Sequence, residues 1–271
     1  TFVVAERTAS DGRPAIDGFV SAVRRDRLWF LSMLFVLPDA QRNGLGRWLL
    51  ESVSPTRAAD GTGGTGAAAS GGDLVRATAT DSVQPISNAL YASIGIVPRM
   101  PLFRFVGRAD RPGELPPLPA GIEVTPFAEI GTEGDGIGSS ALSRELDALD
   151  REVLGFERRI DRAFLATEQR RGFLYCDRGG AAVGYGYTSE AGRVGPVVVA
   201  DGDLLGPVVG HLVTAIEPRG AFGLWMPGEA ESAVVPLLRA GFRIDGFPTI
   251  LCWDRPFADW SRALPISPGL L

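Results

Sequence analysis

The sequence predicts an α/β protein built from two copies of one pattern of strands and helices. Residues 1–36 hold three strand-like segments in succession, "TFVVAERTA", "DGFVSAVRR" and "LWFLSMLFV". An amphipathic helix follows, with Leu45, Trp48, Leu49 and Val53 on one face. The same order of elements returns in the second half. At 271 residues, the chain is long enough for about two domains.

The first copy continues in the same way. Residues 56–73 are rich in Gly, Ala and Ser and predict a flexible surface loop. "LVRATAT" predicts a strand, "ISNALYASIG" a helix that ends at Gly95, and "PLFRFVG" a closing strand.

The second copy repeats this order element by element. "GFLYCDRGG", "AAVGYGYTSE" and "RVGPVVVAD" predict strands, and apolar residues from Leu205 to Ile216 predict a helix. "AFGLWMP", "AVVPLLRAGF" and "PTILCW" then predict a strand, a helix and a closing strand. "LYASIGI" and "LLRAGF" occupy the same position in the two copies. The sequence therefore predicts an N-terminal domain over 1–107, a linker over 108–120 and a C-terminal domain over 121–271.

The copies differ at their starts. Before its first matching strand the second copy has an extra strand, "GIEVTPFA", and two helical stretches, which are marked by Leu142, Leu146, Leu149 and Val153 and by Ile160 and Phe164. The first copy lacks its first strand and helices in this sequence. Either a segment precedes Thr1 in the natural protein or the chain is a fragment; we expect the former, since an uncovered sheet edge invites aggregation. The last residues, "PISPGLL", are expected to fray, with docking on the body as the alternative.

Composition excludes several function classes. All 27 basic residues are Arg, so the chain has no Lys for a P-loop or for a pyridoxal Schiff base. One histidine, His211, cannot form a His-rich metal site, and we expect it to be an ordinary helix residue. A net charge of −5 without a basic run argues against binding of nucleic acid. The chain has no apolar run of 18 residues, so the sequence predicts no membrane span. Cys176 and Cys252 lie in apolar strands, which is typical of reduced thiols in a cytoplasmic protein.

The stretch "VLPDAQRNGLGRWLL", from Val36 to Leu50, predicts an anion-binding turn. A buried strand ends at Pro38, and a loop with Gly44 and Gly46 enters a helix. A helix N-terminus presents free N–H groups and the positive end of a dipole, and glycines let an anion approach closely. This is not the dinucleotide fingerprint, because a third small residue at position 49 and an acid about twenty positions later are missing.

The pattern resembles the GCN5-related N-acetyltransferase (GNAT) family. Its coenzyme A signature has a strand that ends in Val-x-Pro, then Gln/Arg-x-x-Gly-x-Gly/Ala and a helix, which correspond here to Val36–Pro38 and Gln41–Gly46. A second family feature is a helix with Tyr, three residues and Gly, here Tyr91 and Gly95. The resemblance covers nearly the whole chain as a tandem GNAT protein. It implies two domains, each a mixed, mostly antiparallel twisted sheet with a central parallel pair, flanked by helices.

The resemblance also implies roles for individual residues. The cosubstrate would be acetyl-CoA, with no metal. Backbone groups of Leu34, Phe35 and Val36 would pair with the pantetheine arm like an added strand. Tyr91 would be the general acid near the thioester sulfur. The backbone amides implied to hold the pyrophosphate belong to Gln41, Arg42, Asn43, Gly44, Leu45, Gly46 and Arg47.

The sequence departs from the family at two positions. An Asn that contacts coenzyme A often stands seven residues before the Tyr; Gln84 stands there, and either Gln84 makes the same hydrogen bonds or the role passes to Asn88. A Glu on the buried strand often acts as base, but "LWFLSML" offers only Ser32. Asp81 is the nearest acidic candidate for the base, and a water relay is equally compatible.

The second copy has no such ligand motif. Its loop, "VVVADGDLLGPVVG", carries Asp201 and Asp203, and the Tyr91 position holds Leu237 or Leu238. The C-terminal domain is therefore expected to be non-catalytic and to buttress the first domain or to wall the acceptor site. The function implied is acetyl transfer to a primary amine of a small molecule or peptide. The alternatives are an acetyl-CoA sensor and a purely structural pair of domains, and the resemblance is compatible with a homodimer.

Overall fold

The computed structural model covers the whole chain and describes residues 1–9, 11–55, 74–130 and 140–271. The predicted flexible loop over 56–73 lies outside the described residues. Among the described helices none is long and apolar enough to cross a membrane.

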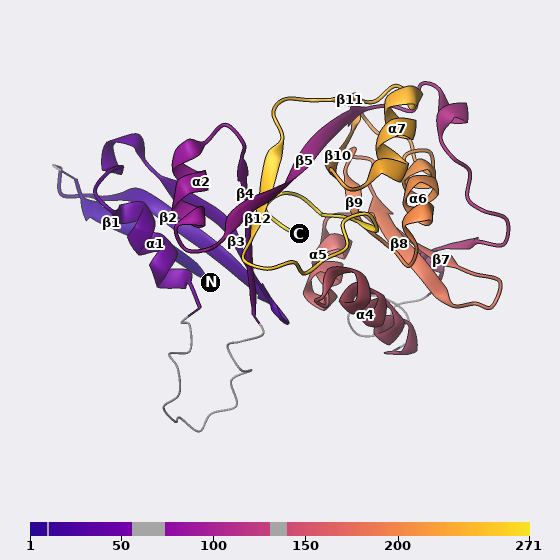
Figure 1. Cartoon of the computed structure of the whole chain (residues 1–271), viewed down its shortest axis with the longest axis horizontal. Coiled ribbons are helices and arrows are strands. Elements are labelled where there is room, and N and C mark those ends of the chain that lie inside the picture. The colour runs from indigo at the N-terminus through magenta and orange to yellow at the C-terminus, as the bar shows by residue number, and fades with distance from the viewer. Residues whose placement is uncertain (10, 56–73, 131–139) are drawn as a thin grey trace.

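The first sheet has eight strands, in the order β1-β2-β3-β4-β12-β5-β10, with β11 on β5 (Figure 1). Only the β3–β4 pair is parallel. This confirms the predicted α/β class and its mixed, mostly antiparallel sheet with a central parallel pair. The strands are β1 Phe2–Thr8, β2 Pro14–Arg25, β3 Leu28–Val36, β4 Val75–Asp81, β5 Val97–Gly107, β10 Phe222–Pro227, β11 Arg243–Ile244 and β12 Thr249–Trp253.

The two halves of the chain share this first sheet by exchanging their closing strands. β12, from the end of the second copy, pairs antiparallel with both β4 and β5 of the first copy. β5, which closes the first copy, runs on to pair with β10 of the second. In Figure 1 the yellow β12 lies beside β4 and β5. The predicted division at 108–120 stays a prediction, and the pairing shows that both halves contribute strands to the first sheet.

The second sheet has five strands, in the order β13-β9-β8-β7-β6, all in antiparallel pairs. The predicted parallel pair of this copy is reduced to one isolated bridge between Arg193 and Gly223. The strands are β6 Glu123–Pro126, β7 Arg171–Cys176, β8 Ala182–Thr188, β9 Val194–Val199 and β13 Ala263–Leu264.

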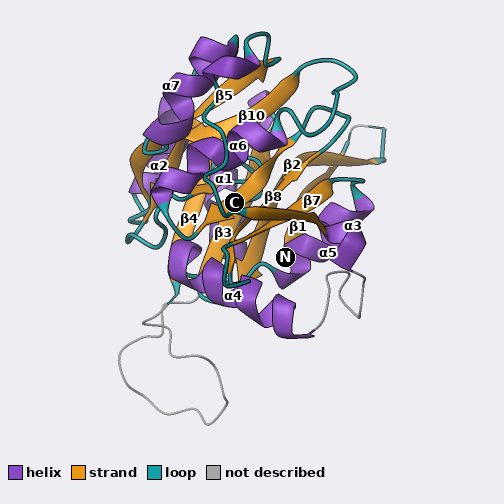
Figure 2. Cartoon of the chain, turned by 90° about the vertical axis from the view of Figure 1, so that its right-hand side faces the viewer, coloured by secondary structure: helices purple, strands orange, loops and turns teal. Residues whose placement is uncertain are grey.

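Helices cover both faces of the second sheet (Figure 2). Leu146 of α4 and Leu165 of α5 share a core with Tyr185 of β8, whereas α6 and α7 pack in another core on the opposite face. In the first copy α1 and α2 cover one face and form the third core with Tyr91. The helices are α1 Leu45–Val53, α2 Pro85–Ala92, α3 Phe127–Ile130, α4 Ser140–Leu154, α5 Arg159–Thr167, α6 Leu205–Leu212 and α7 Glu231–Ala240.

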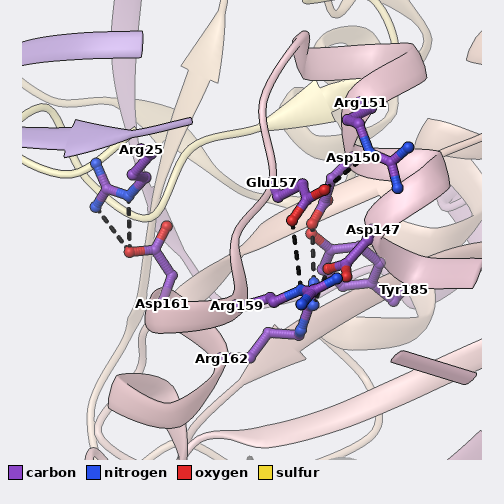
Figure 3. Close-up of polar contacts among 9 residues, drawn as sticks. All are labelled: Arg25, Asp147, Asp150, Arg151, Glu157, Arg159, Asp161, Arg162 and Tyr185. Carbon is purple, nitrogen blue, oxygen red and sulfur yellow. Dashed lines mark hydrogen bonds and ion pairs between the residues drawn. The ribbon is translucent and has the colours of Figure 1, made fainter. Parts of the chain in front are cut away.

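A buried ionic network lies within α4 and α5 and joins the two halves (Figure 3). Arg25 of β2 donates from Nε and Nη2 to Oδ1 of Asp161, at 2.9 and 2.7 Å. Arg162 donates to Asp150 at 2.9 Å and also to Asp147. Tyr185 donates its hydroxyl proton to Asp150. Because each carboxylate has a charged partner, these ions can lie in the core.

This network reverses a predicted helix face. Both helical stretches form, as α4 and α5, but Ile160 and Phe164 are 74% and 40% exposed. Arg162 and Leu165 face inward instead, since the carboxylates of α4 supply ionic partners there. Trp48 of α1 is likewise exposed, while Leu49 and Val53 are buried as predicted.

The C-terminal tail docks on the body rather than fraying. Ile266 and Leu271 are buried in the core that also contains Phe30 and Trp253. The expectation of a frayed terminus is therefore wrong, because the apolar tail has a core to fill. His211 lies on α6 as expected, and its Nδ1 and the Tyr175 hydroxyl share a hydrogen bond of 2.9 Å.

Candidate functional site

The candidate site begins where β3 and β4 part. The two strands pair in parallel from Leu28 with Val75 to Leu31 with Thr78, and Thr78 Oγ1 donates to the Leu31 carbonyl at 2.9 Å. Beyond this pair the strands have no further ladder. The edge of β3 from residue 33 to 36 therefore faces an opening instead of a neighbouring strand.

A β-bulge contributes to this divergence. On β2, Ser21 pairs with Met33 and the next residue, Ala22, pairs with Leu31, so Ser32 is an extra residue in β3. A bulge bends its strand and increases the local twist. It also changes the alternation of side chains, so that Leu34 and Val36 pack on the α1 side and Met33 and Phe35 lie on the other.

The loop after β3 leads into α1 at the mouth of the opening. Gly44, the N-cap, has φ 79°, and Arg42 has φ 69°, which turns the chain sharply into the helix. The N–H groups of Leu45, Gly46 and Arg47 have no hydrogen-bond acceptor within the described part of the chain. A Cβ on Gly46 would lie 3.8 Å from Val36 Cγ2, so its backbone is open to a ligand. The turn therefore has the geometry that an anion-binding turn needs, and anion binding itself stays a prediction.

Gln41 fixes the loop to the end of β3. Its Nε2 donates to the Val36 carbonyl at 3.0 Å. The side chain of Gln41 thereby positions the loop. The Val36 carbonyl already has one partner, and a second lone pair is left for a ligand.

These elements line a cavity of about 830 Å³ between the parted strands. That volume lies within the usual range for a small-molecule site. Asn43, Leu45 and Asn88 do not line it. The predicted site residues that do are Leu34, Phe35, Val36, Gln41, Arg42, Gly44, Gly46, Arg47, Asp81, Gln84 and Tyr91.

Tyr91 of α2 reaches this cavity from the core. It is 5% exposed, and no described residue accepts a hydrogen bond from its hydroxyl. Burial raises the pKa of Tyr91 to about 12, with a smaller contribution from Cys252. The phenol therefore stays protonated at neutral pH and can donate a proton or a hydrogen bond there.

Asp81 and Gln84 line the cavity near the start of α2. Asp81 ends β4 opposite Thr249 of β12, and its side chain is exposed. Asn88 instead donates its amide protons to the carbonyls of Asp81 and Gln84, at 3.2 and 2.8 Å. Asn88 closes the turn before α2, which leaves Gln84 as the amide that faces the cavity.

Residues of the second half complete the cavity. Trp225 of β10, Thr249 of β12, and Pro268 and Gly269 of the tail all line it. Ser32 Oγ donates to the Gly269 carbonyl at 2.6 Å. The sequence named none of these four as site residues. Two of its expectations pointed there: the docking alternative for the apolar tail, and a C-terminal domain that walls the acceptor site.

No metal site accompanies the cavity among the described residues. Groups of three or more His, Cys, Asp or Glu side chains that could hold an ion are absent from that part of the chain.

Comparison with known proteins identifies the fold. No protein-family model and no curated protein sequence matches this chain. A Pyrococcus horikoshii protein proposed to be an acetyltransferase is similar in structure with a TM-score of 0.62 at 12% identity, over 97% of this chain and 78% of the other. A GCN5-related N-acetyltransferase from Sphaerobacter thermophilus has a TM-score of 0.50 at 19% identity, over 94% and 82%.

A third structure, the tandem GNAT protein from the clavulanic acid biosynthesis pathway, has a TM-score of 0.49 at 17% identity, over 94% of this chain and 84% of the other. That score is too low to support an argument. At such identities the first two comparisons establish the fold alone. The chain therefore has the fold of GCN5-related N-acetyltransferases, as the sequence motifs predicted.

Proposed function

We propose that this protein is an N-acetyltransferase that moves an acetyl group from acetyl-CoA to a primary amine of a small molecule or peptide. The observation that carries this proposal is one cavity with two ends of different chemistry. At one end the N–H groups of residues 45–47 and the Arg42 and Arg47 side chains favour phosphates. At the other, a protonated Tyr91 and the edge of β3 surround a place for a thioester.

The residues present fit coenzyme A. A pyrophosphate matches the free amides and the two arginines at the α1 N-terminus. The pantetheine arm contains amide groups, and the unpaired edge of β3 at residues 33–36 offers backbone groups that such amides can meet. Open space beside Gly44 and Gly46 supports close approach.

The chemistry is direct attack. When bound, acetyl-CoA supplies the thioester; the nitrogen of a neutral amine forms the new amide bond as the carbon–sulfur bond breaks, and the proton lost by the nitrogen balances the thiol formed. Coenzyme A thiols have a pKa near that of Cys, about 8.5. Full proton transfer from a phenol of pKa about 12 is uphill, so Tyr91 acts by donating a hydrogen bond to the sulfur as charge develops.

An acetyl-CoA sensor is the second candidate, and one observation favours it. β3 carries no carboxylate in the cavity, and the Ser32 hydroxyl is committed to Gly269. A sensor would keep the phosphate loop and would need no base. A cytoplasmic location, a homodimer and the absence of nucleic-acid partners remain predictions alongside either function.

Two measurements on the full natural chain test the proposal. Calorimetric titration with acetyl-CoA is expected to give one site per chain. Release of free thiol is then followed over a panel of primary amines, with acetylated product identified by mass. Binding without thiol release on any amine would favour the sensor, and a flat titration would overturn both functions.

A further inference from the structure

The cavity crosses the first sheet, and side-chain alternation separates its two faces. Leu34 and Val36 lie on the face covered by α1 and α2, together with Tyr91. On β4, Ala79 packs on the core of the opposite face, and Asp81, two residues further on, lies on that same opposite face. The loop before α1 and Tyr91 therefore lie on one face of the first sheet, and Asp81 lies on the other.

Four further cavity residues lie on this opposite face, which we call the acceptor face. Met33 and Phe35 alternate with the core residues Leu34 and Val36. Thr249 pairs directly with Asp81 across β4 and β12, and Trp225 packs against the core of this face. The acceptor face is therefore defined by Met33, Phe35, Asp81, Trp225 and Thr249.

Charge on the acceptor face is a single negative group. Asp81 is the one carboxylate among the described residues that line the cavity. No cation among the described residues pairs with it, although many other acids in the chain have Arg partners. An unpaired carboxylate beside an apolar wall attracts a cation, and its pairing would be partly shielded from water.

The rest of the acceptor face is apolar. Met33 and Phe35 are 47% and 59% exposed, which is high for such side chains. The Phe35 ring contacts the Phe19 ring at 5.2 Å between centroids, so the apolar wall continues along β2. Trp225, supplied by the second half, faces the cavity across the opening. Such walls are stabilised by an apolar ligand that removes them from water.

We infer that the acceptor is a primary amine carried on an aromatic or similarly flat apolar group, with its ring against Trp225 and Met33. Its ammonium is bound by Asp81 and loses one proton to solvent water before the neutral amine attacks. The inference rests on the proposed function. Asp81 is here a binding and specificity-determining residue. Polycationic acceptors such as polyamines or aminoglycosides are disfavoured, because a second positive charge finds no further carboxylate among the described residues that line the cavity.

Thiol release with matched amines tests this inference on the unmodified chain. The panel is 2-phenylethylamine, ethanolamine and putrescine, which differ in the apolar group and in charge. We expect kcat/KM for phenylethylamine to exceed that for the other two amines by at least about tenfold, because burying part of a ring strengthens binding by about that factor.

Two variants separate the two contacts. Asp81→Asn is expected to raise KM for phenylethylamine about 10- to 100-fold, the range for losing a charged hydrogen bond, while acetyl-CoA affinity stays unchanged. Trp225→Ala is expected to reduce the preference for phenylethylamine over ethanolamine. Asp245→Asn is the matched control, because Asp245 is an exposed carboxylate paired with Arg104 that does not line the cavity.

The outcomes distinguish the inference from the function it rests on. If acetyl-CoA binds and putrescine or ethanolamine is used as well as phenylethylamine, the acceptor inference is overturned and the acetyltransferase stands. An unchanged KM in Asp81→Asn also overturns it. If acetyl-CoA does not bind, or binds without any thiol release, the proposed acetyltransferase fails and the acceptor inference fails with it.

Discussion

The cavity in the first half and its counterpart in the second half differ in what occupies the strand edge. In the first half, β3 leaves its edge open beyond Leu31. In the second half, the matching strand β9 is paired on the matching edge by β13, with Ala263 opposite Val198 and Leu264 opposite Val197. The chain's own segment thus takes the position that we assign to the pantetheine arm.

The N-termini of α1 and α6 differ in the same way, because the first is open and the second is filled by the chain itself. A Cβ on Gly46 meets only ordinary contacts, whereas a Cβ on Gly206 of α6 would clash with the Ser232 carbonyl oxygen. Before α6, the Asp201 carboxylate accepts from the Asp203 N–H, so an acid of the chain caps this turn. The second turn is therefore packed and capped from within, and no anion is needed there.

The tyrosine position completes the comparison. Tyr91 and Leu237 precede glycines with positive φ, Gly95 and Gly241, and the residue after each glycine donates its N–H to the Tyr91 or the Leu237 carbonyl at 3.0 Å. The two helix ends thus share this hydrogen bond and the following glycine, whereas the side chain at the tyrosine position differs. The fold persists in the second half while each ligand contact is replaced by a contact within the chain.

The largest effect is expected from a change in β13, the segment that pairs with the edge of β9. Leu264 is fully buried in the second core, so Leu264→Ala is expected to lower the free energy of unfolding by about 2–5 kcal/mol. Acetyl-CoA affinity should stay within about threefold, because Leu264 does not line the first cavity. Denaturant unfolding and calorimetry measure the two quantities.

A matched control for this variant is Leu238→Ala on α7, where the side chain is 39% exposed and the expected loss is below about 1 kcal/mol. A second acetyl-CoA site in Leu264→Ala would show that β13 masks a working site instead of replacing a lost one.

The second prediction introduces a carboxylate, such as the second copy carries before α6, at the N-terminus of α1. Gly46→Asp is expected to weaken acetyl-CoA binding about 100-fold, because a carboxylate at this N-terminus would compete for the free amides and repel a phosphate. Gly46→Ala, whose Cβ fits at 3.8 Å from Val36, controls for bulk. Equal affinities of the Asp and Ala variants in calorimetry would remove the loop from the phosphate site.

The third prediction concerns the tyrosine. Tyr91→Phe should lower turnover about tenfold, the modest value expected when hydrogen bonding to the sulfur replaces full proton transfer. Acetyl-CoA affinity should be nearly unchanged. Tyr175→Phe is the control in the second half, because Tyr175 is buried and bonded to His211 away from the cavity. Thiol-release kinetics measure the turnover of both variants. Wild-type turnover in Tyr91→Phe would refute the assignment of Tyr91 to the thioester sulfur.

Local signals predicted much of this fold. The apolar run of β3, the glycines at the start of α1 and the spacing from Tyr91 to Gly95 are properties of neighbouring residues, and the strand, the turn and the helix form as expected. The expectation that β3 is buried throughout is wrong, because Met33 and Phe35 face the opening and are exposed. The strand exchange is not local. The residues of β12 have the same apolar character whichever strands flank them, so their pairing with β4 depends on the path of the chain in space.

The acceptor face escaped prediction for the same reason. Trp225 and Gly269 are more than 130 residues away from Tyr91 in sequence. The pairing of β10 with β5 brings Trp225 to the cavity, and docking of the tail on Ser32 brings Gly269 there. The inner face of α5 was mispredicted because apolar periodicity assumes that charged residues face water. Arg162 is buried by ion pairs that a hydrophobic pattern cannot register.

The two halves also differ in buried charge, because the ionic network places titratable groups in the core of the second half. Burial raises the pKa of Asp150 to about 6 from its ordinary value of 3.8, although Arg158 and Arg162 lower it. The folded protein therefore holds a proton that the unfolded chain releases between about pH 4 and pH 6. Stability from this group is present below pH 4 and is lost as the pH rises through about 6.

Asp150→Asn removes this titration and gives the smallest effect. The unfolding free energy of wild type, relative to Asp150→Asn, should fall by on the order of 1 kcal/mol from pH 4 to pH 6.5, because one pKa unit is worth about 1.4 kcal/mol and pairing with Arg162 offsets part of the shift. Urea unfolding at several pH values measures the difference. Asp17→Asn, at the surface pair with Arg7, should run parallel to wild type. A difference that rises with pH would mean that the Asp150 carboxylate is stabilised as an anion by its arginines, and that the second core carries its charges ionised throughout.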